Sequence, residues 1–215
     1  MQLNNPAGAL FDLDGVLIDT EGQYSIFWAE TGRKYNVGGP TFADDIKGTN
    51  LALILARFPE EVREEVRAAI HHYEHVMDYP LYPGAIDLLE SLHAAGIPIA
   101  IFTSSDNMKM DLLFSRHPEV SAHVDAIITG DMVTHSKPDP EGYLTAAAAI
   151  GRDISRCYVF EDSMQGLEAG RLSGARVIGI ATTNPESKIA PLCHAVITPS
   201  PASPPPGCWR SDTAA

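Results

Sequence analysis

The sequence has few cationic side chains, and this shortage excludes one class of partner. Lys and Arg together number 15, against 28 Asp and Glu, which gives a formal net charge of −13. Proteins that bind nucleic acid through its phosphate backbone use basic surfaces. We therefore expect no nucleic-acid partner.

Cysteines and long apolar runs are also scarce. The three cysteines, Cys157, Cys193 and Cys208, form no Cys-x-x-Cys pair, and this usage fits a reducing cytoplasm. The sequence has no apolar run long enough to span a bilayer, and no basic N-terminal region followed by an apolar stretch. We expect a soluble, cytoplasmic protein with no membrane partner. We also expect a monomer, because the pattern contains no extended apolar surface.

Strand-like apolar runs alternate with helical segments through most of the 215 residues. The runs lie at residues 8–12, 97–102, 125–129, 157–161, 176–181 and, more briefly, 195–198. Helix signals between them are Pro83-Gly84 before residues 85–95, Asp139-Pro140 before a segment that ends at Gly151, and Ser163 as a cap. This alternation predicts a doubly wound, Rossmann-like α/β core whose parallel sheet is covered by helices on both faces.

Residues 21–79 break the alternation, because they carry helical signals and few strand signals. A helical block between the first strand and the rest predicts an inserted domain. We expect a core of residues 1–17 and 82–198 and a helical cap of residues 18–81, with hinge strands near 17–21 and 80–84. The Pro-rich tail, residues 199–215, cannot form a regular element and is expected to be disordered.

Two carboxylates, Asp12 and Asp14, follow the first apolar run. Residues i and i+2 of a strand point to the same face, so the pair would leave the strand side by side. Adjacent like charges are costly unless a cation or a proton lies between them. The spacing therefore suggests a nucleophile, a neighbouring acid/base and a shared divalent ion. A solvated polar loop is the alternative for an isolated pair.

Three further polar motifs follow along the chain. Thr103-Ser104-Ser105 ends the run at 97–102, Glu161-Asp162-Ser163 ends the run at 157–161, and Lys137 lies between Ser136 and Pro138. A doubly wound sheet binds ligands outside the carboxyl ends of its strands. We therefore expect Asp12, Thr103 and Asp162 to converge on one site.

The four motifs, in this order, resemble those of the haloacid dehalogenase superfamily, and the helical insertion resembles the cap of its β-phosphoglucomutase-like subgroup. The resemblance implies that Asp12 is the nucleophile and forms an aspartyl-phosphate, and that Asp14 is the acid/base. It also implies a Mg²⁺ site made of Asp12, the backbone carbonyl of Asp14 and Asp162, with Glu161 reaching the ion directly or through water. For Glu161 alone, a surface acid beside a helix N-terminus is the alternative.

The same resemblance assigns the substrate contacts. Lys137 is expected to bridge Asp12 and the phosphate as a point charge, while the Thr103 hydroxyl and the Ser104 amide bind phosphate oxygens. The loop before Leu51 resembles the cap loop that contacts substrate. Its Lys47 and Asn50 are therefore candidates for specificity, with an ordinary surface role as an equal alternative.

A histidine cluster in the helical block invites a second metal interpretation. His71 and His75 are one helical turn apart, and His72 lies beside them. No obvious third or fourth ligand lies nearby in the sequence, so we expect an exposed polar face instead. Asp106 and Asn107 are expected to cap the helix after Thr103 or to face the substrate.

The resemblance predicts a magnesium-dependent phosphatase acting on small phosphorylated metabolites, with sugar or polyol phosphates as the expected class. The phosphomutases of the subgroup carry a histidine after the hinge and an arginine in the cap loop, where this chain has Tyr24 and Leu51, and a lysine where it has Asp106. Replacing the arginine by leucine removes bidentate phosphate recognition. We therefore favour hydrolysis. A β-phosphoglucomutase-type phosphomutase is the alternative, and a non-catalytic regulatory member of the fold or a receiver-like phosphoacceptor module has less support.

Overall fold

The computed structural model describes residues 7–199, and within them six parallel strands form one sheet in the order β3-β2-β1-β4-β5-β6. The strands are β1 (Gly8–Phe11), β2 (Ile99–Phe102), β3 (Ala126–Ile128), β4 (Cys157–Glu161), β5 (Arg176–Ile180) and β6 (Ala195–Ile197). Each strand lies within the apolar run that predicts it. The predicted parallel α/β core is therefore confirmed.

Ten α-helices lie in the described part of the chain, joined by short 3₁₀ turns. They are α1 (Glu21–Tyr35), α2 (Phe42–Asp45), α3 (Leu51–Leu55), α4 (Arg63–Val76), α5 (Ala85–Ala94), α6 (Asn107–Arg116), α7 (Pro118–Ala122), α8 (Glu141–Ala149), α9 (Met164–Ser173) and α10 (Glu186–Ile189). Ser163 caps α9 as predicted, accepting a hydrogen bond from the Gly166 amide at 3.1 Å. Helix α8 begins one residue later than predicted, at Glu141, whose amide donates to the Asp139 carboxylate at 2.9 Å.

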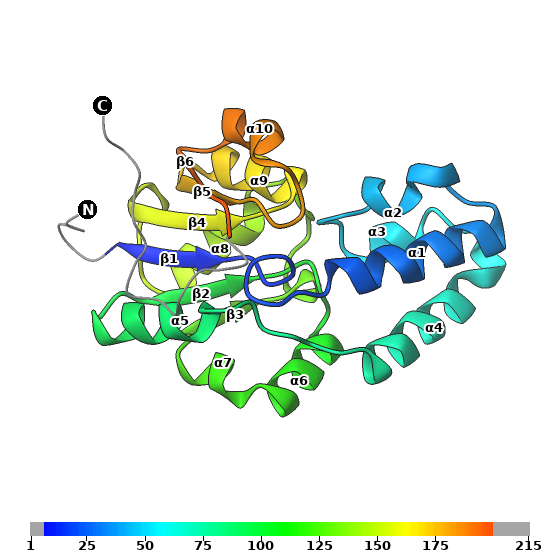
Figure 1. Ribbon diagram of the computed structural model, residues 1–215, viewed down its shortest axis with the longest axis horizontal. Helices are drawn as coiled ribbons and strands as arrows, with labels where there is room; N and C mark the ends of the chain where they lie inside the picture. Colours follow the sequence, from blue (N-terminus) through cyan, green and yellow to red (C-terminus); the bar gives the residue numbers. More distant parts are fainter. Residues whose placement is uncertain (1–6, 200–215) are drawn as a thin grey trace.

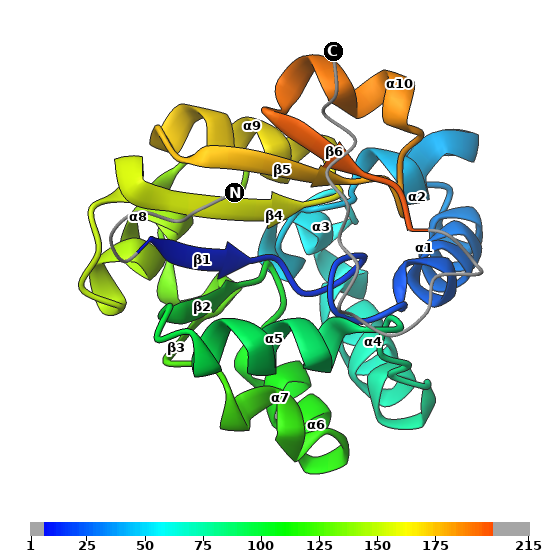
Figure 2. The same cartoon turned by 60° about the vertical axis from the view of Figure 1, so that its left-hand side comes forward.

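Both faces of the sheet are buried, and alternate strand residues pack on opposite sides. Ala9 and Phe11 belong to the cluster that joins the sheet to α5, α6 and α7, whereas Leu10 and Ala100 belong to the cluster that includes α8. Figure 2 shows α5 on one side of β1 and β2 and α8 on the other. Cys157 is fully buried in the second cluster, in agreement with its predicted place in a strand.

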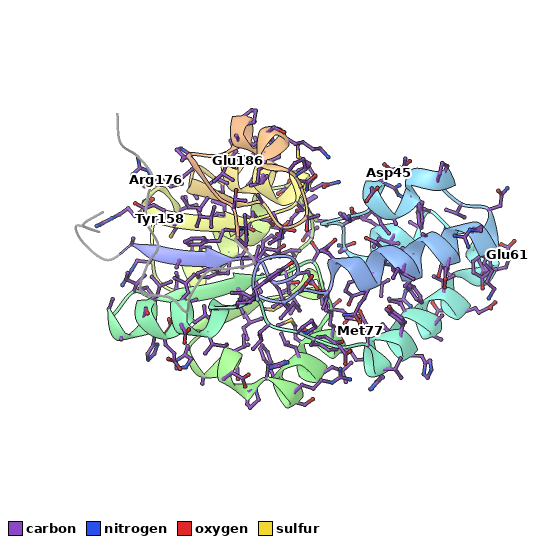
Figure 3. All side chains as sticks on the ribbon, viewed as in Figure 1. Asp45, Glu61, Met77, Tyr158, Arg176 and Glu186 are labelled. Atoms are coloured by element: carbon purple, nitrogen blue, oxygen red, sulfur yellow. The ribbon has the colours of Figure 1, made fainter. Side chains whose placement is uncertain are left out.

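Helices α1 to α4 form a separate block with an apolar core of their own. Trp28, Phe42, Phe58 and Val66 are buried together within it. Figure 1 shows this block beyond the arrowheads of β1 and β4, so it covers the carboxyl ends of the strands. In Figure 3, Glu61 lies at the end of the block farthest from the sheet, and Met77 lies on the side near the core. The inserted helical block that the sequence predicts is confirmed.

Two short extended segments connect the block to the sheet. Ile18 and Leu81 form an isolated antiparallel bridge, and the Asp19 amide donates to the Pro80 carbonyl at 2.7 Å. These contacts lie where the hinge strands are predicted. The predicted tail lies outside the described residues from position 200 onward. Among the helices described, none is long and apolar enough to cross a membrane.

Candidate active site

Lys137 and Asp12 form the centre of the site at the carboxyl end of β1. The Lys137 ammonium lies 2.8 Å from Asp12 Oδ1 and 2.5 Å from Glu161 Oε1. The side chains of Lys137 and Glu161 are fully buried, and that of Asp12 is 8 % exposed. Because a buried charge is stable only when it is paired, this ion pair fixes the position of the Asp12 carboxylate.

Glu161 uses both carboxylate oxygens in contacts within the protein. Besides Lys137, Oε1 accepts a hydrogen bond from the Tyr143 hydroxyl at 2.9 Å. Oε2 accepts from the Asp162 amide at 3.0 Å and from the amide and hydroxyl of Ser163, both at 3.1 Å. Glu161 is therefore not a surface acid at a helix end; it is a buried group that orients Lys137.

Burial and mutual repulsion shift the acidic groups of this cluster. Burial, followed by the charge of Glu161, raises the pKa of Asp12 to about 8, although Lys137 opposes the shift. The same two causes raise the pKa of Asp162 well above its usual range. The carboxylates Asp12 and Glu161 outweigh burial and raise the pKa of Lys137. Three carboxyl groups around one ammonium therefore need protons or a further cation to be stable at the strand ends.

The donor set fits a hard divalent cation. Asp12, Glu161 and Asp162 each offer an oxygen within 4.8 Å of the others. Both carboxylate oxygens of Asp162 are buried. Burial raises the pKa of the group and the nearby Thr183 hydroxyl lowers it slightly, but no group within residues 7–199 donates a well-formed hydrogen bond to either oxygen. A buried carboxylate without partners requires a proton or a cation. Glu161 and Asp12 already contact Lys137, so of the three carboxylates Asp162 has the most capacity left for an ion.

Two glycines allow the close approaches on which this cluster depends. Gly15 has a φ of +79°, and a Cβ there would overlap the Asp162 carboxylate. A Cβ at Gly166 would overlap the carboxylate of Glu161. The turn after Asp14 and the first turn of α9 can therefore lie against the acidic cluster only because both positions lack a side chain.

Asp14 is held by three other side chains from different parts of the chain. Its Oδ1 accepts from the Lys109 ammonium at 2.5 Å and from the Thr20 hydroxyl, and its Oδ2 accepts from the Ser105 hydroxyl at 3.2 Å. Lys109 also lies 4.5 Å from the centre of the Tyr24 ring. These contacts join the turn after β1, the hinge and α6 around the predicted acid/base.

Lys109 and Thr20 are site residues that the sequence motifs do not reveal. Lys109 is 1 % exposed although it is a lysine in a helix. Its one sequence signal is its place in the first turn of the helix that follows Thr103, which faces the carboxyl ends of the strands. Thr20 directly follows the predicted hinge residue Asp19, but nothing in the sequence aims it at Asp14.

The Thr103 loop lies beside these carboxylates. Thr103 is 1 % exposed, its amide donates to the Ile128 carbonyl at 3.0 Å, and its hydroxyl accepts from the Ser105 amide at 3.1 Å. The Ser104 hydroxyl donates to the Gly48 carbonyl at 2.8 Å, which links the core to the helical block. The predicted convergence of Asp12, Thr103 and Asp162 is present, because all three line one cavity.

That cavity lies between the strand ends and the helical block. Its wall on the core side includes Asp12, Asp14, Thr103, Ser104, Ser105, Asp106, Lys109, Lys137 and Asp162. Its wall on the side of the block includes Glu21, Tyr24, Ser25, Trp28, Lys47, Thr49, Leu51 and Glu74. The cavity therefore places the candidate catalytic residues of the core opposite polar, acidic and aromatic side chains of the helical block.

The two candidate specificity residues occupy different places. Lys47 lines the cavity, and its ammonium lies 3.0 Å from the exposed Asp44 carboxylate. Asn50 is the N-cap of α3, where its side chain accepts from the Leu53 amide at 3.0 Å. Asn50 is not among the residues that line the cavity, whereas its neighbours Thr49 and Leu51 are.

The histidine cluster differs partly from expectation. His72 and His75 are exposed as predicted, but His71 is half-buried and its Nε2 lies 3.2 Å from Asp106 Oδ2. His71, Glu74 and Asp106 offer ligand atoms within 4.8 Å of one another. The expectation that no third ligand lies near His71 is therefore wrong, because Asp106 of the core, the predicted N-cap of α6, is brought against α4.

Comparisons with known proteins agree with this geometry. A profile of the haloacid dehalogenase-like hydrolases matches residues 6–174. The chain is 30 % identical to validoxylamine A 7'-phosphate phosphatase of Streptomyces hygroscopicus subsp. limoneus over 85 % of this chain and 89 % of that protein. It is 31 % identical to fructose-1-phosphate phosphatase YqaB of Escherichia coli, over 81 % of this chain and 96 % of that protein.

A solved structure shows the same fold. The β-phosphoglucomutase of Clostridium difficile superposes with a TM-score of 0.74 at 20 % identity, over 90 % of this chain and 91 % of that one. The predicted resemblance, carried by four motifs that the fold gathers at one edge of the sheet, is confirmed. The chain belongs to the haloacid dehalogenase-like hydrolases and is a phosphoric monoester hydrolase.

Proposed function

We propose that the protein is a magnesium-dependent phosphatase that hydrolyses sugar or polyol phosphates through an aspartyl-phosphate on Asp12. The observation that carries the proposal is the ion pair of 2.8 Å between Lys137 and Asp12, beside a second aspartate held at the same strand end. Two relatives support the substrate class, one named as a validoxylamine A 7'-phosphate phosphatase and the other as a phosphatase of the sugar phosphate fructose 1-phosphate.

The first step transfers the phosphoryl group to the protein. A carboxylate oxygen of Asp12 attacks phosphorus in line, the bond from phosphorus to the ester oxygen breaks, and Asp14 gives a proton to the departing alkoxide. The Lys137 ammonium, the Thr103 hydroxyl and the Ser104 amide bind the phosphoryl oxygens. Each of these groups lines the cavity.

The second step returns the protein to its starting state. Asp14, now a carboxylate, takes a proton from a water molecule that attacks phosphorus, and the bond from phosphorus to Asp12 breaks to release inorganic phosphate. The Thr20, Ser105 and Lys109 contacts keep Asp14 in reach of both the alcohol and the water.

Asp12, Asp162 and the carbonyl of Asp14 would hold Mg²⁺ in this proposal. When bound, the ion would neutralise negative charge on the phosphoryl oxygens and on the carboxylates that hold it. The two Asp162 carboxylate oxygens, which have no hydrogen-bond partner among the described residues, support this assignment, as does the raised pKa of that group. Glu161 acts through Lys137, whose position it fixes.

The test is release of inorganic phosphate from a panel of sugar, polyol and nucleotide phosphates with Mg²⁺, for the natural chain and for Asp12→Asn. We expect release from a few sugar or polyol phosphates and a loss of at least about 10³-fold in the variant, since an amide is a poor nucleophile of similar shape. Substantial turnover by Asp12→Asn would remove Asp12 from its proposed role. No release by the natural chain, together with isomerisation of a sugar phosphate, would favour a phosphomutase.

A further inference from the structure

Two carboxylates of the helical block line the cavity without taking part in the proposed chemistry. Glu21 begins α1 at the hinge, and Glu74 lies near the end of α4. Glu74 is 6 % exposed, and its Oε1 accepts from the Tyr24 hydroxyl at 2.8 Å. In the described part of the chain, Oε2 of Glu74 and Oε2 of Glu21 are both buried and have no hydrogen-bond partner.

These unpaired oxygens carry an energetic cost that a ligand can remove. Leaving a buried acceptor without a donor costs about 1–3 kcal/mol, and more for a charged group. Burial raises the pKa of Glu21 to about 7, and burial also raises that of Glu74 although Lys109 and the Tyr24 hydroxyl oppose the shift. A molecule in the cavity that brings hydrogen-bond donors would stabilise both groups.

The cations of the cavity are already paired. Lys137 contacts Asp12 and Glu161, Lys109 contacts Asp14, and Lys47 contacts Asp44. The cavity lining contains these three lysines and no arginine within the described residues. Lys137 is assigned to the transferred phosphate, and Lys109 is held by Asp14. A second anionic group on the substrate would therefore meet Glu21 and Glu74 with only Lys47, already paired with Asp44, left among the described lining residues to balance it.

We propose that Glu21 and Glu74 bind hydroxyl groups of the alcohol part of the substrate, and so select neutral polyhydroxylated phosphate esters over esters with a second anionic group. In its ionised form, each carboxylate accepts a hydrogen bond from a hydroxyl and repels a carboxylate or a second phosphate. Such selection arises because only a ligand with hydroxyl groups at these positions gives the buried carboxylate oxygens a hydrogen bond. The proposal rests on the proposed phosphatase activity for its simplest test, and it names the residues that set the substrate class.

Matched pairs of esters test the proposal directly. Sorbitol 6-phosphate and 6-phosphogluconate differ at one carbon, where a hydroxymethyl group is replaced by a carboxylate; glycerol 3-phosphate and 3-phosphoglycerate form a shorter pair. We expect the natural chain to show a kcat/KM at least about tenfold higher for the neutral member of a pair. Glu74→Gln and Glu21→Gln should each reduce that ratio by about tenfold, mainly through KM.

The variants are chosen so that folding is not in question. Glutamine retains an oxygen that can accept from Tyr24, and it removes a buried charge, so thermal unfolding should not occur at lower temperature. Glu64→Gln on the same helix is the control, because the Glu64 side chain is 83 % exposed and pairs with Arg67. Its kcat/KM ratio should equal that of the natural chain.

Binding separates failure of this proposal from failure of the phosphatase assignment. Dissociation constants of sorbitol 6-phosphate and 6-phosphogluconate are measured by calorimetry for Asp12→Asn and for Asp12→Asn with Glu74→Gln. If no ester is hydrolysed but the neutral ester binds more tightly and the second substitution removes that preference, the subsite stands and the proposed hydrolysis is wrong. Equal binding or turnover of the two members, or a preference that survives both glutamine variants, would overturn the subsite.

Discussion

The two walls of the cavity differ in how completely their polar groups are paired. On the core wall, Lys137 and Asp14 have their partners within the protein before any ligand arrives, and Glu161 lies buried behind Lys137. On the wall formed by the helical block, Glu21 and Glu74 each leave an oxygen without a partner in the described chain. The chemical groups are thus preorganised, whereas the recognition groups become satisfied only when a substrate is present.

Lys137→Met is the variant expected to have the largest effect, and it tests whether the pairing of the core residues positions the nucleophile. Removing the ammonium leaves Asp12 and Glu161 buried without their cation, which should cost about 3–5 kcal/mol of unfolding free energy. Phosphate release should fall by at least about 10³-fold, because the nucleophile also loses its orientation. Urea unfolding and initial rates measure the two effects. The control is Lys188→Met, since Lys188 is exposed and its ammonium donates to the Asn184 side chain at 2.9 Å. A small effect of Lys137→Met would mean that Asp12 is positioned by other groups.

Asp162 is the exception on the core wall, and Asp162→Asn tests it. We expect activity to fall by about 10²-fold and Mg²⁺ to lose most of its stabilising effect, because a buried carboxylate without partners is the proposed ion ligand. Without Mg²⁺, the variant should unfold at the same or a higher temperature than the natural chain, since a raised-pKa acid has been replaced by a neutral amide. A magnesium titration of thermal unfolding that is identical in both proteins would show that Asp162 does not hold the ion.

The pH dependence of the free energy of unfolding, measured without metal, tests the protonation of Asp12 on the core wall. The pKa of Asp12 is about 8 in the folded protein and 3.8 as its ordinary value, so between these values the folded state binds a proton that the unfolded state does not. Stability must therefore fall as pH rises across this window, by up to about 1.4 kcal/mol per pH unit for this group. Urea unfolding in chelator from pH 5 to pH 8 measures the slope, and Asp12→Asn should flatten it. A rise in stability over the same window would mean that Asp12 is already ionised.

The sequence predicts the core wall better than the wall of the helical block, for a physical reason. Asp12, Thr103 and Asp162 each follow an apolar run, and parallel strands bring their carboxyl ends to one edge, so local pattern and sheet geometry together locate them. Glu74 and Lys109 enter the site because α4 packs against α6, and no local pattern encodes that packing. Their burial contradicts the usual exposure of charged residues.

The same limit explains Asn50 and His71. The resemblance of the cap loop draws attention to Asn50, but a residue directly before a short apolar helix is also a good N-cap, and that is the role the structure gives it. His71 is half-buried because Asp106 of the core lies opposite it, a contact across 35 residues of chain. In both cases the sequence predicts the helix correctly, but it does not show which residue of the core the side chain meets, because that depends on how the helical block packs on the core.

Lys47→Gln should have the smallest effect, and it sharpens the comparison between the walls. The Lys47 ammonium is already balanced by Asp44, whose side chain is 74 % exposed, and exposed ion pairs contribute little. We therefore expect kcat/KM for a neutral polyol phosphate to fall by no more than about threefold, with the loss in KM. Initial rates for sorbitol 6-phosphate measure it, with Glu64→Gln as a reference for an exposed charge change. A loss approaching 10²-fold would mean that the Lys47 ammonium itself binds the alcohol part of the ester, and the contrast between fixed chemistry and recognition of hydroxyls by Glu21 and Glu74 would have to be abandoned.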